Sequence, residues 1–143
     1  MSKQTEVNLE VGHLRAQAQD IARRVTEGPA ESQNRLFYDG LRASTIPYLP
    51  CYMQDRAGDL YSRCYESLYY LGQASIPLTV AFTMHLYNLA ALATLPVPNA
   101  PDFERRRQIL VDNVRKYKSL IAISSFGENI RHKDAPPTGV QVT

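Results

Sequence analysis

Residues 67–101 contain no Asp, Glu, Lys or Arg, and this long uncharged run limits what the chain can fold into. A helix that spans a bilayer needs roughly 20 consecutive apolar residues, so length alone would allow a membrane helix here. However, Gly72, Gln73, Ser75 and Pro77 interrupt the run, and a proline inside a helix removes a backbone hydrogen-bond donor. We therefore expect two shorter helices that meet near residues 75–77 and pack inside a protein, with no membrane span.

The second half of the run, residues 77–94, is predicted to be a helix that begins at Pro77, because proline is tolerated in the first turn. Spacings of three and four define a core stripe on this helix: Leu78, Phe82, Leu86, Leu89 and Ala93. A second row lies elsewhere on the helix at spacings of four: Val80, Met84 and Asn88. Because the helix is apolar nearly all round, we expect most of its circumference to be buried.

The composition of the 143-residue chain is that of one globular domain of ordinary size. Hydrophobic residues make up 44% and charged residues 21%, which excludes a disordered chain. The net charge of +2 is too small to indicate nucleic acid or an anionic membrane as a partner. Cys51 and Cys64 lack the spacing of metal ligands, so we expect structural thiols in a reduced, cytoplasmic protein.

Three further amphipathic helices are predicted before and one after this central helix, giving an all-α bundle of about five. The first covers residues 6–27, where apolar positions repeat until Gly28, and the second covers residues 30–43. The third covers residues 55–74, and its tyrosines, Tyr61, Tyr65, Tyr69 and Tyr70, are interpreted as packing residues, with a binding site as the alternative. The last covers residues 102–118, with an apolar side formed by Ile109, Leu110 and Val114.

Two other stretches have clear predictions. Residues 44–53 contain Pro47 and Pro50, so an extended loop is expected to carry apolar side chains across the bundle. The basic cluster of residues 105–107 is interpreted as a solvated helix face, with an anion site as the alternative.

The character of the sequence changes at Ser119. Residues 119–126 are short and apolar and precede Gly127, which predicts a strand, and residues 140–143 predict a second strand. A lone hairpin is marginally stable. We therefore expect a helical domain over residues 1–118, followed by the start of an incomplete β-domain over residues 119–143.

Searches for catalytic motifs give no catalytic residue and no metal site. The sequence has no glycine-rich phosphate loop, paired-cysteine zinc pattern or nucleophile elbow. His13, His85 and His132 lie far apart in the sequence, and His85 on its apolar helix is predicted to be a hydrogen-bonded core residue. Nothing singles out Glu66 or Glu128 as a catalytic acid or base.

Three segments together resemble the N-terminal helical domain of the acyl-CoA dehydrogenase family and the first strand of its middle β-domain. LRASTIPYLP is similar to the family segment where a helix gives way to a proline-containing loop. TMHLYNLAAL is similar to a helix in which an apolar-His-apolar triplet often occurs, and ERRRQILVDNVRKYKSLIAISS is similar to the charged helix that leads into the β-domain. The resemblance covers about residues 7–143.

The resemblance implies two kinds of site. The family helix similar to residues 77–94 helps to line the acyl-chain pocket, which implies substrate-binding roles for Val80, Met84 and Asn88; the alternative is that these residues belong to the core. The family strand similar to residues 119–126 contacts FAD through a Thr or Ser, which implies a cofactor-binding role for Ser125. The sequence departs from the family at the positions that follow: Phe126, Gly127, Ile130, Arg131 and His132.

The implied activity is that of a flavin-dependent oxidoreductase that acts on the CH–CH bond of an acyl-CoA. In the family, the catalytic base and most of the flavin site lie beyond the region that this chain resembles. We therefore expect that the isolated chain does not bind FAD and is inactive alone, and that it needs a partner chain or associates with itself. The alternative function is a non-catalytic helical interaction protein derived from the same fold.

Overall fold

The protein is an all-α bundle, as predicted from the sequence. The computed structural model describes residues 7–96 and 101–121, which contain no strand. Six α-helices and two short 3₁₀-helices account for the regular structure in these ranges: α1 (Val11–Glu27), η1 (Ala30–Ser32), α2 (Gln33–Ala43), η2 (Ile46–Tyr48), α3 (Leu49–Tyr52), α4 (Ala57–Gly72), α5 (Ile76–Thr94) and α6 (Pro101–Tyr117).

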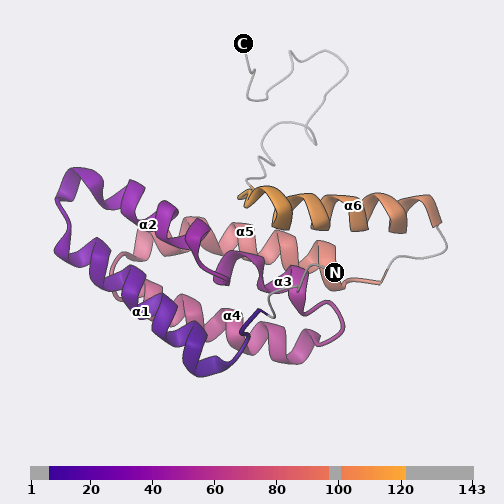
Figure 1. The fold of residues 1–143 in the computed structure, drawn as a ribbon, viewed down its shortest axis with the longest axis horizontal. Helices are drawn as coiled ribbons and strands as arrows, with labels where there is room; N and C mark the ends of the chain where they lie inside the picture. The colour runs from indigo at the N-terminus through magenta and orange to yellow at the C-terminus, as the bar shows by residue number, and fades with distance from the viewer. Residues whose placement is uncertain (1–6, 97–100, 122–143) are drawn as a thin grey trace, which may run out of the picture.

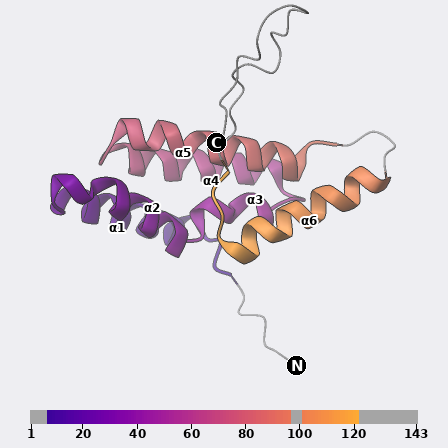
Figure 2. The same ribbon diagram turned by 90° about the horizontal axis from the view of Figure 1, so that it is seen from above.

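The helices form two layers (Figures 1 and 2). One layer contains α1 and α2, and the other contains α4 and α5, with α1 packed on α4. The short helix α3 lies near the middle of the bundle, and α6 packs on α3 and α5 at one side. The layer of α4 and α5 is the one farther from the viewer in Figure 1.

The core between the layers follows the helical spacing of the apolar residues. The inward stripe of α1 is fully or almost fully buried and consists of Leu14, Ala18, Ile21 and Val25. At the centre, Phe37 of α2 meets Phe82 of α5 edge to face, with 6.4 Å between ring centroids. Aromatic pairs in this geometry add stability beyond the area that they bury.

Helix α1 begins at Val11, later than the predicted start at residue 6. The side chain of Asn8 accepts a hydrogen bond from the backbone N–H of Glu10 at 3.0 Å. Such a local bond gives the backbone an alternative to the helix. The turn therefore ends the extended segment directly before the helix.

The predicted extended loop over residues 44–53 is wrong in its conformation, because the segment folds into η2 and α3. Pro47 and Pro50 each occupy one of the first two positions of a short helix, where the missing N–H has no helical partner to lose. The prediction that this segment carries apolar side chains into the bundle is confirmed, since Ile46, Leu49 and Met53 are fully buried.

The predicted junction between two helices at residues 75–77 is confirmed. Ser75 caps α5, its hydroxyl accepts a hydrogen bond from the N–H of Leu78, and Pro77 lies in the first turn. Helix α5 is long and apolar enough to cross a membrane by length and composition, a property that buried helices of soluble proteins share; 39% of its most apolar window is buried. Of its 19 residues, seven are buried, six are half-buried and six are exposed, so the prediction that most of its circumference is buried holds only in part.

The predicted apolar side of helix α6 is confirmed for Val114 and wrong for Ile109 and Leu110, which are about half exposed. Val111, which was not predicted, is buried beside Val114. The reason is that α6 packs on α3 and α5 through the side that carries these two valines. A charged helix with several apolar residues does not reveal from its own sequence which of them face its neighbours.

Residues 119–121, at the start of the predicted first strand, are described and form no regular element. The rest of that strand, residues 122–126, and the second predicted strand, residues 140–143, lie outside the described residues. Ser125, Glu128 and His132 lie outside them as well.

Candidate binding face on helices α4 and α5

An apolar groove runs between α4 and α5 and has a volume of about 360 Å³. Helix α4 contributes the lining residues Tyr61, Cys64, Tyr65 and Leu68, and α5 contributes Thr83, Leu86, Tyr87 and Ala90. We call this feature the α4–α5 groove. None of its lining residues carries a formal charge at neutral pH.

The row predicted on α5 lies on the solvent-exposed side of that helix. Val80 is 62% exposed and Met84 is 51% exposed. Asn88 is half-buried, and its side-chain amide donates to the carbonyl of Met84 at 2.7 Å. Val80 and Met84 are therefore not core residues, which was the alternative interpretation left open by the sequence. None of the three residues of this row lines the α4–α5 groove.

The predicted packing role is wrong for three of the four tyrosines of α4. Tyr61, Tyr65 and Tyr69 are exposed, and Tyr65 shows 76% of its surface. Tyr70 does pack against the core, and the guanidinium of Arg15 lies 5.6 Å from its ring centroid. The exposure of these three tyrosines could have been predicted from their spacing. Residues 61, 65 and 69 are four apart and lie away from the buried stripe of Leu60, Cys64, Ser67 and Leu71.

The groove can bind an apolar group but has little to offer to a polar one. The hydroxyl of Thr83 donates to the carbonyl of Thr79 at 2.8 Å, within its own helix. Burial raises the pKa of the Cys64 thiol to about 12, so this thiol stays protonated at neutral pH. The chemistry available in the groove is therefore hydrophobic contact, with the tyrosine hydroxyls at its edge.

The remaining candidate nucleophile and base are structural. Burial raises the pKa of Cys51 to about 11, and its thiol donates to the carbonyl of Val111 at 3.6 Å. His85 is 2% exposed and hydrogen-bonded, which confirms the predicted core role. Because reactive cysteines require a thiolate, neither thiol is poised for nucleophilic attack.

No group of three or more His, Cys, Asp or Glu side chains that could hold a metal ion occurs among residues 7–96 and 101–121. Glu66 is bound to Arg15 at the surface. Two further hollows are lined largely by polar residues, one near Arg56 and Arg63 and one near Arg23. Arg63 donates to the carbonyl of Leu9 at 2.9 Å, and Arg23 pairs with acidic residues of α1.

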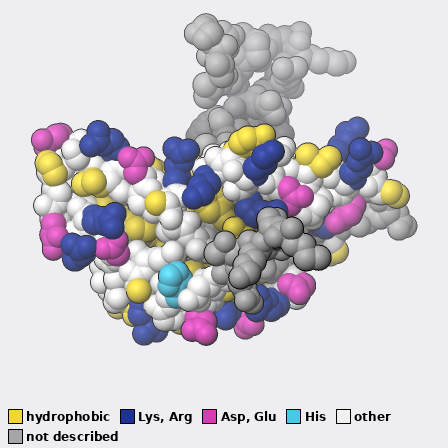
Figure 3. Space-filling model, viewed as in Figure 1, with side chains coloured by type: hydrophobic (Ala, Val, Ile, Leu, Met, Phe, Trp, Pro, Cys, Tyr) yellow, Lys and Arg dark blue, Asp and Glu magenta, His cyan; other side chains and the backbone are white. Residues whose placement is uncertain are grey.

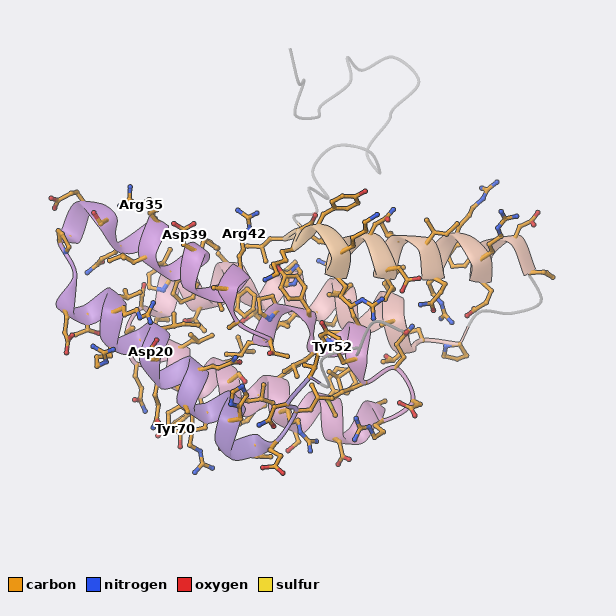
Figure 4. All side chains as sticks on the ribbon, in the orientation of Figure 1. Asp20, Arg35, Asp39, Arg42, Tyr52 and Tyr70 are labelled. Atoms are coloured by element: carbon orange, nitrogen blue, oxygen red, sulfur yellow. The ribbon has the colours of Figure 1, made fainter. Side chains whose placement is uncertain are left out.

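The face viewed in Figure 3 is of a different kind, because basic and acidic side chains of both signs are interspersed there with small apolar patches. Along α2, Arg35, Asp39 and Arg42 stand on the outer edge (Figure 4). In the basic cluster of α6, Arg105 and Arg106 are exposed, as predicted for a solvated face. Arg107 instead pairs with Glu104 and donates to the carbonyl of Leu95.

Neither a family model, a curated protein nor a solved structure matches this chain.

Proposed function

We propose that this chain is the helical part of an acyl-CoA dehydrogenase-like flavoenzyme, and that its α4–α5 face contributes to binding the acyl chain of the substrate. The observation that carries the proposal is the exposure of Val80 and Met84 on α5, the helix that forms one wall of an uncharged groove. Among the exposed apolar residues of α5, the resemblance to a pocket-lining helix selects Val80 and Met84, together with the half-buried Asn88.

An alkyl chain suits the size and chemistry of the groove. Burying one methylene group is worth about 0.8 kcal/mol, so six methylenes offer roughly 5 kcal/mol before the cost of ordering the ligand. On its own, such a gain corresponds to binding near the millimolar range. A tight site would require further walls, which in the proposed enzyme come from other domains.

The chain is proposed to be inactive alone. Removal of hydride from an acyl thioester by a flavin needs a base that takes the α-proton on the opposite face of the substrate. No carboxylate lines the α4–α5 groove as described. FAD, with Ser125 as a proposed contact, and the base both belong to the complete enzyme in this proposal.

The test is binding of a long-chain acyl-CoA to the purified protein, measured by isothermal titration calorimetry. We expect Val80→Asp and Met84→Asp to weaken binding at least about tenfold, because the resemblance assigns both residues to the acyl-chain contact and each substitution would place a charge there. Neither residue lines the α4–α5 groove itself, so the proposed contact lies on the face of α5 outside it. Both residues are exposed, so circular dichroism should show unchanged helix content. Free CoA should not bind, since the proposed contact is with the acyl chain.

Phe103→Asp is the matched control, because Phe103 is an equally exposed apolar residue on α6, 52% accessible. This variant should bind acyl-CoA as the unmodified chain does. Equal loss in all three variants would mean that binding depends on general surface hydrophobicity. Binding that survives both α5 substitutions would remove these residues from the proposed site.

The second candidate is a non-catalytic helical interaction protein, and the exposed tyrosines Tyr61, Tyr65, Tyr69 and Tyr87 favour it. Tyrosine is enriched in protein–protein interfaces. Under this alternative, Val80→Asp and Met84→Asp would weaken self-association or partner binding, measured by light scattering, while acyl-CoA would not bind even to the unmodified chain. Acyl-CoA titration and light scattering together thus distinguish the two candidate functions.

A further inference from the structure

His85 lies at a junction that neither the proposed site nor the helix packing explains. The imidazole stacks on Phe82 with 5.6 Å between ring centroids and an angle of 19°, and it meets Tyr48 edge to face at 6.4 Å. It is 2% exposed. A buried imidazole costs free energy unless its ring nitrogens find hydrogen-bond partners.

Both ring nitrogens of His85 have backbone partners. Nε2 lies 2.8 Å from the carbonyl oxygen of Pro47, and the N–H of Ile121 points at Nδ1 over 2.9 Å. A carbonyl can only accept and an amide N–H can only donate, so Nε2 carries the proton and Nδ1 carries none. One neutral side chain on α5 therefore ties η2 to the segment that follows α6.

That segment is held at other points as well. Lys118 ends α6 with a positive φ of 49°, and two backbone bonds close the turn: Lys118 N–H to Arg115 O and Ser119 N–H to Val114 O. This pair of bonds is a Schellman motif, in which the left-handed residue reverses the chain direction. Arg42, labelled in Figure 4 beside this end of α6, donates from Nε to the carbonyl of Lys118 at 3.2 Å.

The end of the segment packs into the bundle. Leu120 lies against the main core, and Ile121 lies against the smaller cluster formed by Tyr48, Leu89 and Val114. The position of residues 118–121 is therefore held by contacts with α2, η2 and α5 together. In this arrangement, the bond from Ile121 to His85 is the last described anchor.

We propose that His85 is a proton-sensitive latch that holds Ile121 against the bundle, and that protonation of Nδ1 releases Ile121 from it. A protonated Nδ1 carries a hydrogen that faces the N–H of Ile121, so the bond cannot persist and the two donors repel. The Nε2 bond to Pro47 is compatible with either state. Protonation therefore breaks the bond to Ile121 and leaves the bond to Pro47 in place.

The groups around His85 determine the pH at which its bond to Ile121 breaks. The elements that pack on α5 are η2, α3, α4 and α6, and their ionisable groups include Tyr48 of η2, Cys51 and Tyr52 of α3, Cys64 of α4, and Asp112 and Arg115 of α6; Arg42 of α2 contacts the segment after α6. Of these, Tyr48 lies against the imidazole, and burial raises the pKa of its hydroxyl to about 12, so it is neutral. Burial lowers the pKa of His85 below 6.5, and the bond to Pro47 opposes part of that shift.

The pH dependence follows from the sign of that shift. Well above pH 6.5, the ordinary pKa of histidine, the imidazole is neutral in both the folded and the unfolded chain, and the latch is closed. As the pH falls below 6.5, the unfolded chain takes up a proton that the closed latch excludes, so the contribution of the latch to stability declines. It is lost as the pH falls through the lowered pKa of the folded protein.

The experiment uses NMR on the ¹⁵N-labelled full chain, which reports the His85 tautomer and the hydrogen exchange of the Ile121 amide from about pH 8 to about pH 4. At the upper end, we expect the Nε2–H tautomer and a protected Ile121 amide. As His85 becomes protonated, the protection factor of this amide should fall about tenfold, because one hydrogen bond is lost. The protection factor is corrected for the change of the intrinsic exchange rate with pH. The amides of Leu14 and Ala18 in α1 should keep their protection over the same range.

Two variants isolate the bond to Ile121 at neutral pH. His85→Asn keeps an acceptor near the position of Nδ1 and should retain most of the protection of the Ile121 amide. His85→Phe removes the acceptor and should expose that amide about tenfold. His13→Gln at an exposed position is the control and should change nothing.

A protonated Nδ1 in the unmodified chain at neutral pH would overturn the proposal. So would an Ile121 amide that exchanges freely there, or one whose protection does not follow the titration of His85. These measurements need only the unmodified chain, so they decide the question even if a variant folds poorly. They do not depend on acyl-CoA binding, so the proposed function and the latch can fail separately.

Discussion

Replacing Phe82 with alanine should lower the free energy of unfolding by about 3–5 kcal/mol, the usual cost of deleting a buried phenylalanine ring. Phe82 is 1% exposed, and it touches Phe37 across the two layers and His85 within α5. Its removal would leave a cavity at the point where the layers meet. Since small domains are stable by only about 5–15 kcal/mol, urea unfolding followed by circular dichroism should show a large shift of the midpoint.

Tyr87→Ala on the same helix is the control, because Tyr87 is 65% exposed. It should change stability by no more than about 0.5 kcal/mol, as is usual for surface substitutions. A comparable loss of stability in both variants would mean that the exposed side of α5 is covered in solution. That result would favour self-association through the α4–α5 face.

The helical fold could be predicted because most of its helices have local signals. In α1, apolar residues recur at helical spacing and end at Gly28, and in α5 the cap Ser75 and the first-turn Pro77 mark the start. These features act within a few residues of the position that they determine. No tertiary information is needed to interpret them.

The sequence-based predictions failed where contacts between distant parts of the chain determine the local structure or the burial of a helix. Residues 46–52 form two short helices because their side chains fit the middle of the bundle, and their prolines permit a helical first turn without demanding one. Helix α5 is apolar nearly all round, yet one side is exposed, because helices pack against only part of its surface. Local sequence cannot specify how many neighbours a helix will have.

The candidate site could be predicted only in part. The spacing of Val80 and Met84 placed them in one row, and the structure leaves that row exposed. The α4–α5 groove, which neither residue lines, depends on how α4 meets α5, so nothing in the local sequence indicates that Tyr61 and Tyr65 border a groove. The bond from Ile121 to His85 joins residues 36 positions apart in the sequence and had no local signal.

Replacing Val111 with aspartate should detach α6 from the bundle and cost about 3–5 kcal/mol, the usual effect of leaving an unpaired charge in a buried position. Val111 is fully buried, and its carbonyl accepts a hydrogen bond from the thiol of Cys51. Leu110→Asp, one residue earlier, should be tolerated, because Leu110 is 48% exposed. Urea unfolding of the two variants measures the difference.

This pair tests the orientation of α6 directly, since the sequence predicted Leu110, with Ile109 and Val114, on the apolar side of the helix and did not include Val111. Hydrogen exchange adds a second measurement: in Val111→Asp, the amides of α6 and of Ile121 should lose protection, whereas those of α1 should retain it, because α1 packs on α2 and α4. If Leu110→Asp were the more damaging substitution, α6 would be rotated about its axis relative to the bundle. The turn at Lys118 and the bond from Ile121 to His85 would then have to be rearranged as well, because both depend on how α6 ends beside α2.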